Sequence, residues 1–543
     1  MIWKEKTRMI KKIPTYVWAL IAITALGVFL RAYNFHDWLL FGPDQVRDAV
    51  IVGDALEGRS GPILLGSQAG NTQFYLGPLY YQFQYVSGLV FGNTPDKFAY
   101  PDLLFSILTI PVLFFFLKKY FSTGISLSLS ALFSVSYFSI KISRFAVNSN
   151  ALPFFMIAFL YGLLEMMDEK NKNKRVWAII VGISLGVGVQ LHALSFLAMP
   201  AIALAVCAYL IVRKNLVWKN FLLVLVFFLL ANFGQLTYEM KTGGDNFKQF
   251  LKGVDSQPEV LDENLFQSVS LTMFCQTRSH IYHISSLTDA KYCARQLNLK
   301  KIIASYKKTD SQWFLIKALA GILFALGGYA LWFRNFFKEP DPDRKRFLAL
   351  VMLSNVIFLG LFAPIVFQAE VHYFDAIFFM PFIFLGLWIK RIKETGWRPE
   401  IKKAALALSA VILLFSNSYS IGADARGYVF GEASDGDACV LGEIIPAANY
   451  MAENSRGFKK AYLSGSRVSL HRFSDALAYL AAKSGVEITR LRGDDKEKIE
   501  PGVPFFDVKL VGDYPEKDAD AIGGREVRDF KKFGKVVVYI LDN

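Results

Sequence analysis

Long apolar runs recur through most of the chain, and they constrain its fold more than any other feature. A helix that crosses the hydrocarbon core of a bilayer needs roughly 20 mostly apolar residues. We predict eleven such spans near residues 15–31, 100–117, 123–141, 150–167, 176–191, 193–213, 219–236, 313–333, 347–367, 373–390 and 401–420. The pattern predicts an α-helical polytopic membrane protein.

Composition supports this class and argues against others. Hydrophobic residues make up 53% and aromatic residues 15% of the 543 residues, more than a soluble core requires. The net charge of +14 does not indicate nucleic acid, because the basic residues lie between apolar runs and not on one continuous face. Four scattered cysteines are too few for a disulfide scaffold, so stability is expected from helix packing in lipid.

The basic segments predict the orientation of the chain. If residues 1–14 are a cytoplasmic amino terminus, every strongly basic short loop falls on the cytoplasmic side, as in most membrane proteins. We therefore predict a transmembrane domain over residues 15–420 in the cytoplasmic (plasma) membrane and an extracytoplasmic domain over residues 421–543. Long outer loops are expected at 32–99 and 237–312.

Two segments allow alternative interpretations. The aromatic stretch 74–91 could be a twelfth span, but it is short and carries Gln82 and Gln84, so we assign it to a helix in the membrane interface. The start of the chain could be a signal peptide. The apolar run is long, however, and no small-residue cleavage site follows it before Arg31, so a retained helix is predicted.

The outer loop 237–312 and the tail 421–543 contain few residues that indicate a reaction or a ligand. Cys275, His280, His283 and Cys293 in the loop 237–312 could form a zinc site, but a Cys275–Cys293 disulfide is the simpler prediction in an oxidising compartment. The tail is predicted to be a small α/β domain. Its expected elements are strands at 460–464, 505–511 and 535–541 and a helix at 474–483 that Ser474 caps and Gly485 ends.

An acid and arginine cluster, Phe41 to Asp48, lies about ten residues beyond the first span. A carboxylate just outside a bilayer can reach both a lipid-borne substrate and a water-side acceptor, and Asp44 is the candidate general base. The simpler interpretation of Asp44 is a cap for a helix that begins near Gln45. Arg47 could bind a phosphate through bidentate contacts, or it could merely face lipid headgroups.

Other outer turns contain polar residues on the side of the membrane predicted for Asp44. The candidates for substrate or phosphate binding are Arg144, Asn148, His192, His372 and Tyr373. Each also has a structural interpretation: an interfacial anchor for Arg144, a packed turn for His192, and the polar start of a helix for His372 and Tyr373.

These residues occur in segments that resemble the GT-C class of glycosyltransferases, in particular the protein O-mannosyltransferases and the lipid A aminoarabinose transferases. The segments are the cluster around Asp44, Tyr75 to Tyr81, Ser143 to Pro153, Gln190 to His192, and His372 to Phe374. The resemblance covers roughly residues 10–395.

The resemblance implies an inverting transfer of a sugar from a polyprenyl-phosphate donor, with Asp44 as the catalytic base and Arg47 as the arginine of the same motif. The sequence departs from many relatives at Gln45, where they carry a second acid, which weakens any role that needs two carboxylates, including a bridged metal. Asp48 is a partial substitute if the stretch is helical. Tyr75, Tyr80 and Tyr81 are expected to line a donor groove or stack on the sugar.

We therefore expect a hexosyl- or pentosyltransferase that acts on a protein, glycan or lipid acceptor and contacts membrane lipids but no nucleic acid. No cofactor is required by this chemistry, and a divalent metal is left open. The alternative is a transporter or flippase of lipid-linked saccharides, although the spans lack the buried carboxylates and internal repeat expected of one. A membrane scaffold that presents the tail is a third possibility. The sequence does not indicate the sugar, the acceptor or the oligomeric state.

Overall fold

The protein is described by a computed structural model that covers a defined part of the chain. The described residues are 13–70, 72–255, 265–287, 314–368, 371–430, 439–491, 499–511, 521–522 and 525–542.

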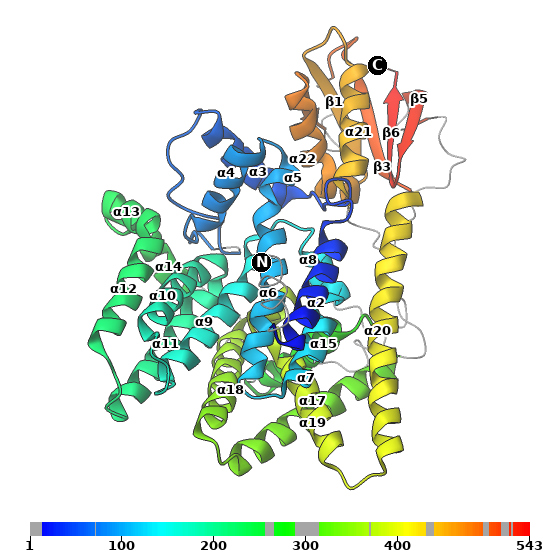
Figure 1. Ribbon diagram of the computed structural model, residues 1–543. Helices are drawn as coiled ribbons and strands as arrows, with labels where there is room; N and C mark the ends of the chain where they lie inside the picture. Colours follow the sequence, from blue (N-terminus) through cyan, green and yellow to red (C-terminus); the bar gives the residue numbers. More distant parts are fainter. Residues whose placement is uncertain are drawn as a thin grey trace, which may run out of the picture.

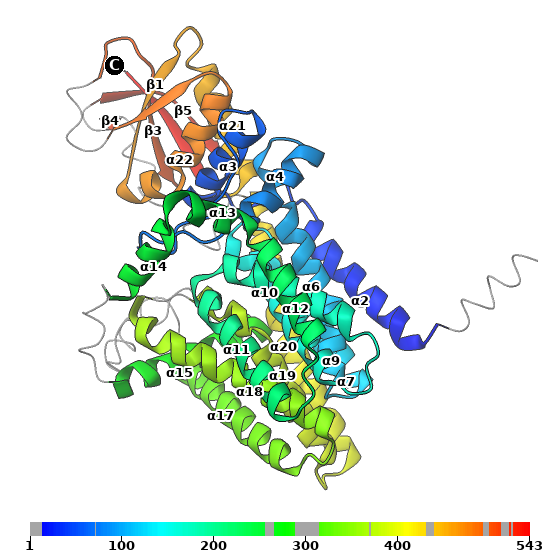
Figure 2. The same cartoon turned by 90° about the vertical axis from the view of Figure 1, so that its left-hand side faces the viewer.

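A bundle of long helices forms the body of the molecule, as Figures 1 and 2 show. The helices of the bundle are α2 (Thr15–Ala32), α6 (Tyr100–Lys118), α7 (Thr123–Ser134), α8 (Tyr137–Ile142), α9 (Leu152–Met167), α10 (Lys174–Leu191), α11 (Ala193–Val212), α12 (Trp218–Ala231), α15 (Leu265–Ile284), α17 (Phe314–Lys338), α18 (Pro342–Phe362), α19 (Phe379–Glu394) and α20 (Pro399–Phe430). The polytopic helical class predicted from the sequence is confirmed.

Eight helical segments in the described part of the chain are long and apolar enough to cross a membrane, or nine if the bent pair α12 and α13 (Phe233–Thr242) counts as one span. The number eleven is not confirmed. The predicted span 219–236 is this bent pair, whose axes differ by 66°. The predicted span 373–390 begins as the 3-10 helix η4 (Val371–Ile377) before α19.

The predicted span 123–141 is broken between α7 and α8, and a buried arginine explains how the break is tolerated. The last carbonyls of α7 have no partner within the helix. Arg31 of α2 donates to the carbonyl oxygens of Ser134 (2.7 Å) and Phe133 (3.2 Å), and its Nε donates to Ser106 Oγ. Arg31 is fully buried, so these bonds join α2, α6 and α7.

The segment predicted as the outer loop 237–312 is helical in its described part, which differs from the prediction. It contains α14 (Asp245–Asp255) and α15, and α15 packs against α17, α19 and the 3-10 helix η3 (Ala363–Gln368). Polar residues such as Gln276 lower the hydropathy of α15. Gln276 bonds Asn355 of α18 and the hydroxyl of Tyr329 of α17, so bundle contacts satisfy this polar side chain.

Short helices lie at one end of the bundle, at the top of Figure 1. They are α3 (Pro43–Leu56), α4 (Leu79–Phe91) and α5 (Pro95–Phe98), and the 3-10 helix η1 (Asn148–Ala151) precedes α9. The aromatic stretch 74–91 thus contains a 13-residue helix that is too short to be among the candidate spans. Leu89, Val90 and Phe91 at its end are exposed, as expected of a helix in contact with lipid.

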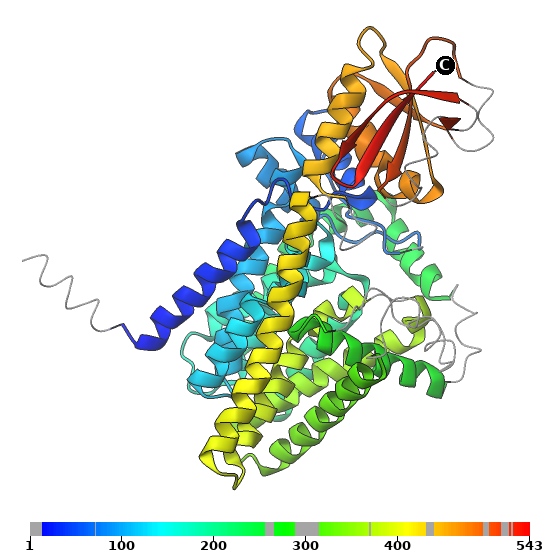
Figure 3. The same ribbon diagram turned by 90° about the vertical axis from the view of Figure 1, so that its right-hand side faces the viewer.

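A small α/β domain follows α20 and lies at the same end as α3 (Figures 1 and 3). Its elements are α21 (Leu441–Glu453), β1 (Lys460–Gly465), α22 (Arg467–Lys483), β2 (Glu487–Arg490), β3 (Phe505–Leu510), β4 (Ala521–Ile522), β5 (Arg525–Phe533) and β6 (Val536–Leu541). The sheet has the order β2-β1-β3-β6-β5-β4. Strand β1 is parallel to its neighbours β2 and β3. The pairs β3–β6, β6–β5 and β5–β4 are antiparallel.

The three predicted strands match β1, β3 and β6, and the positive φ of Gly485 (+85°) agrees with a helix that ends just before it. The predicted helix begins seven residues earlier than expected, at Arg467. Ser474 is therefore inside the helix, where its hydroxyl donates to the carbonyl of Leu470, and is not the cap. Helix α21 and strands β2, β4 and β5 were not predicted. Helix α20 also runs past the expected domain boundary at 420.

Candidate active site at the start of α3

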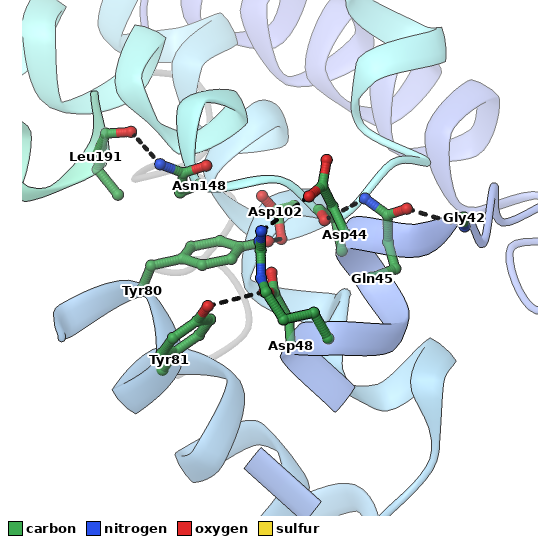
Figure 4. Close-up of polar contacts among 11 residues, drawn as sticks. Gly42, Asp44, Gln45, Asp48, Tyr80, Tyr81, Asp102, Asn148 and Leu191 are labelled. Carbon is green, nitrogen blue, oxygen red and sulfur yellow. Dashed lines mark hydrogen bonds and ion pairs between the residues drawn. The ribbon is translucent and has the colours of Figure 1, made fainter. Parts of the chain in front are cut away.

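Helix α3 presents Asp44 because of how its first turn is built. Pro43 is the first helical residue, where its missing N–H costs nothing. The side chain of Gln45 reaches back, and its Oε1 accepts the N–H of Gly42 at 2.9 Å. Asp44 is the second residue of the helix and not its cap, while Gln45 bonds back to the residue before the helix (Figure 4), and the Asp44 side chain remains 62% exposed.

The strand-like segment before α3 is bonded on both sides. The N–H of Leu40 donates to the carbonyl of Arg144 (2.9 Å), and the N–H of Phe41 donates to that of Cys439 (3.2 Å). The N–H of Leu441, in α21, donates in turn to Leu39 (2.9 Å). Gln45 adds a bond from Nε2 to the carbonyl of Ala146 (2.9 Å). The position of Asp44 therefore depends on both the bundle and the C-terminal domain.

Arg47 joins two carboxylates of α3. Its Nη1 donates to Asp44 (2.8 Å), while Nε (2.9 Å) and Nη2 (2.7 Å) both donate to Asp48 Oδ1. Asp48 lies one helical turn from Asp44, because the stretch is helical from Pro43 onward. The arginine orients Asp44, and all three of its nitrogens are engaged by carboxylates. A phosphate contact by Arg47 stays a prediction and would require these bonds to rearrange.

The two carboxylates differ in environment. The side chain of Asp48 is 4% exposed, and burial raises its pKa to about 6 even though Arg47 opposes the shift. Burial, the largest single effect, would lower the pKa of Arg47, but the charges of Asp48, Tyr81 and Asp44 and the hydrogen bond to Asp48 together raise that pKa above its usual range. The hydroxyl of Tyr81 donates to Asp48 at 2.9 Å, and burial raises the pKa of this tyrosine, so it stays a donor. Asp48 supports Arg47, and Asp44 faces solvent.

A second tyrosine and carboxylate pair lies beside the first (Figure 4). The hydroxyl of Tyr80 donates to Asp102 of α6 at 3.1 Å. Tyr80 and Tyr81 are 2% and 1% exposed, so their rings face protein and not an open donor groove, which differs from the expectation. Asp102 was missed from the sequence. A carboxylate at the start of a predicted span is a signal that could have identified it.

The predicted residues from three other turns come together in a second group. Asn148 Nδ2 donates to the carbonyl of Leu191 (2.7 Å), next to His192. The ring of His192 meets that of Tyr373 edge to face, with centroids 4.8 Å apart. His192 Nδ1 accepts the N–H of Leu194 and so caps α11. That acceptor role places the proton of the neutral ring on Nε2.

Arg144 occupies a different position from the one expected of a phosphate ligand. Its Nη2 donates to the carbonyls of Leu30 (2.9 Å) and Tyr33 (2.7 Å) at the end of α2, and its guanidinium lies 5.2 Å from the Trp38 ring centroid. Burial lowers its pKa to about 10, so the charge is kept at neutral pH. This arrangement caps α2 and matches the anchoring interpretation. Its Nη1 makes no hydrogen bond in the described part of the chain.

The remaining predicted site residues are His372 and Tyr75. His372 lies in η4, but its side chain is outside the described part. Tyr75 is 37% exposed, and Asn246 of α14 bonds its backbone N–H (2.7 Å) and carbonyl (2.9 Å). Tyr75 is therefore the one predicted groove tyrosine whose side chain is exposed.

The structure bears on the alternative of a zinc site in the segment 237–312 but does not test the predicted disulfide. Within the described ranges, no three His, Cys, Asp or Glu side chains are grouped so that they could hold a metal ion, and Cys275, His280 and His283 are included in that statement. The guanidinium of Arg47 lies between Asp44 and Asp48 and pairs with both carboxylates. Cys293 lies outside the described residues, so the Cys275–Cys293 disulfide stays a prediction.

Comparison with known proteins agrees with the sequence motifs. Residues 77–234 match the model of the dolichyl-phosphate-mannose-protein mannosyltransferase family. No curated protein sequence matches the chain. The fold is similar to ArnT from Cupriavidus metallidurans bound to undecaprenyl phosphate (TM-score 0.52, 12% identity) and in its apo state (0.51, 12%), with 97% of both chains covered in each case. A partial likeness to the S. cerevisiae Pmt1-Pmt2 complex has a TM-score of 0.34 and 15% identity over 43% of this chain and 34% of that one.

The chain is therefore an integral membrane protein with the GT-C-type fold of ArnT. It is similar to the dolichyl-phosphate-mannose-protein mannosyltransferase family, as its motifs indicated, and these findings support a glycosyltransferase.

Proposed function

We propose that this protein transfers a sugar from a polyprenyl-phosphate donor to an acceptor on the extracytoplasmic side of the membrane, with inversion at the anomeric carbon. The family match and the likeness to an ArnT structure with bound undecaprenyl phosphate support a lipid-linked donor. The observation that carries the proposal is the exposed Asp44 carboxylate at the start of α3, oriented by Arg47.

In the proposed reaction the acceptor hydroxyl oxygen attacks the anomeric carbon of the sugar. Asp44 accepts the hydroxyl proton as the new carbon–oxygen bond forms. The bond between the anomeric carbon and the phosphate oxygen breaks, and polyprenyl phosphate leaves with the electron pair. Arg47 holds Asp44 in place, and Asp48 with Tyr81 holds Arg47.

The leaving phosphate gains charge and needs hydrogen-bond donors. Of the predicted candidates, we choose His192 and Tyr373 as these donors. They come from separate turns, and their rings are in contact, so both could reach one phosphate group. The Nε2–H of neutral His192 and the hydroxyl of Tyr373 are the donors we assign to this role. Arg144 is committed to the end of α2 through Nη2, which leaves its Nη1 as the atom that could serve a phosphate.

The test is to incubate the purified protein with a panel of polyprenyl-phosphate sugars and to measure release of polyprenyl phosphate, with Asp44→Asn in parallel. Release by the native protein but not by the variant is expected. Equal release by both would remove Asp44 as the base. If no donor is consumed while labelled lipid-linked sugar crosses a reconstituted bilayer, the protein is a flippase and the proposal fails.

A further inference from the structure

The end of the bundle opposite α3 carries a pocket that the proposed reaction does not use. Helix α17 ends there, α18 begins, and α19 ends, at the bottom of Figure 1. The pocket has a volume of about 180 Å³. It is lined by Arg334, Asn335, Lys338, Glu339, Lys390, Arg391 and Glu394.

Positive charge exceeds negative charge in this pocket. Its four cations face two carboxylates, and Glu339 lies 3.7 Å from the guanidinium of a further cation, Arg344. In the part of the chain that the structure describes, the four lining cations make no ion pair within 4 Å. An excess of cations around a pocket favours an external anion.

One of these cations is held in place before any ligand arrives. Lys390 Nζ donates to the Tyr120 hydroxyl and to Asn335 Oδ1, both at 2.9 Å, and lies 4.8 Å from the Tyr120 ring centroid. Arg344 lies 4.8 Å from the same ring and donates to the backbone carbonyl of Tyr120. Tyr120 is 2% exposed, so two cations are fixed around a buried ring. Such preorganisation reduces the entropy lost when an anion binds.

Large apolar side chains surround the same end of the bundle. Phe333 and Phe337 of α17 are 53% and 72% exposed, and Trp397, which follows α19, is 52% exposed. In a protein with this fold such residues contact acyl chains or the membrane interface. A ligand with a phosphate group and acyl chains would match both the pocket and its surroundings.

We propose that this α17–α19 pocket binds the phosphate group of an anionic membrane lipid, at the membrane face opposite Asp44. Arginine and lysine at the pocket would make charge-assisted hydrogen bonds to the phosphate oxygens. The acyl chains would lie along the exposed aromatic residues of α17. This binding site is separate from the proposed glycosyl transfer and does not depend on it.

The test uses the full-length protein in detergent with phosphatidic acid or phosphatidylcholine, and native mass spectrometry measures how much lipid each variant retains. The pocket variant is Lys390→Gln with Arg391→Gln. The matched control is Arg398→Gln with Lys403→Gln, which removes two exposed charges at the same end outside the pocket. We expect retention of phosphatidic acid by the native protein and the control, and at least about tenfold weaker retention by the pocket variant, which corresponds to a loss of about 1.4 kcal/mol or more.

Other outcomes of this experiment would distinguish a lipid phosphate from free inorganic phosphate, or would overturn the proposal. Displacement of the lipid by millimolar inorganic phosphate would support the phosphate site but assign it a soluble ligand. Equal losses in the pocket variant and the control would show only general headgroup attraction and overturn it. A lower melting temperature of the pocket variant with unchanged lipid retention would show that these cations merely stabilise helix ends. Lys390→Arg, which keeps the charge, should retain the lipid.

Discussion

The two ends of the bundle differ in how their cations are neutralised. At the α3 end, Arg47 is bonded to both Asp44 and Asp48, and Tyr81 completes the bonds of Asp48. At the α17–α19 pocket, four cations and two carboxylates line the wall, and within the described residues none of the four cations lies within 4 Å of a carboxylate. Internal pairing holds a reactive carboxylate in one geometry, whereas unpaired cations leave room for an anion from outside. The following changes test the paired end in detail, from the largest expected effect to the smallest.

Asp44→Asn should lower sugar transfer by about 10²–10⁴-fold, the range typical of a general base. Asparagine has nearly the same shape but cannot accept the acceptor's proton. Release of polyprenyl phosphate is the measurement. Asp54→Asn is the matched control, because Asp54 lies on the same helix but pairs with Arg59. Loss of transfer in both variants would mean that the fold of α3, and not the Asp44 carboxylate, is being disturbed.

The buried Asp48 should make the protein more stable as the pH falls from 6 to 4. Its folded-state pKa of about 6 lies above the ordinary value of 3.8, so the folded protein takes up the proton first. The ionised form therefore disfavours folding above pH 6 by roughly 3 kcal/mol, at 1.36 kcal/mol for each pKa unit, and this cost disappears as the carboxyl is protonated.

Thermal unfolding of the native protein and Asp48→Asn in detergent at several pH values checks this expectation. The native protein should gain stability on acidification relative to the variant, which has no group to titrate at this position. Parallel curves for the two proteins between pH 7 and pH 4 would contradict a raised pKa for Asp48.

Gln45→Glu would introduce the second acid that many relatives carry, and we expect it to destabilise this protein by about 1–3 kcal/mol. Glutamate can still accept the N–H of Gly42, but it cannot donate to the carbonyl of Ala146 as Gln45 Nε2 does. The melting temperature in detergent is the measurement. Gln73→Glu, at an exposed position before α4, is the control and should change little. Equal stability of both variants would show that the Ala146 bond contributes nothing.

Tyr81→Phe should have the smallest effect, a loss of about 1 kcal/mol, because one neutral donor to a buried carboxylate is removed. Tyr75→Phe removes a hydroxyl from an exposed ring and serves as the control. Thermal unfolding at pH 7 distinguishes the two. An unchanged melting temperature for Tyr81→Phe would mean that Asp48 relies on Arg47 alone.

The residues that were predicted well are those whose signal is local. Hydropathy identified α2, α6, α9, α10 and α11 nearly to their ends, and turn chemistry identified Gly485. The spacing of Asp44 and Asp48 places them one turn apart because the stretch is helical, whereas the bonds of Arg47 to both carboxylates were not predicted.

The errors arose where partners from elsewhere in the chain decide the outcome. The sequence predicts a loop at α15 because polar residues such as Gln276 lower its hydropathy, and the partners that satisfy Gln276 lie on α17 and α18. The break after α7 depends on Arg31, which is 103 residues away from Ser134. Tyr80 and Tyr81 were expected in a groove, but their hydroxyls bond Asp102 and Asp48 in the interior. Patterns along the sequence do not contain these long-range partners.

The sequence by itself determined the membrane class, most of the long helices and the acid and arginine motif of α3, because hydropathy and helical spacing are properties of neighbouring residues. Only the tertiary structure decided which carboxylate is exposed and which is buried. It also placed the C-terminal domain against the segment before Asp44 and gathered the cations of α17 and α19 around one pocket. Burial and charge pairing depend on residues distant in the chain, so the packed molecule is needed to determine them.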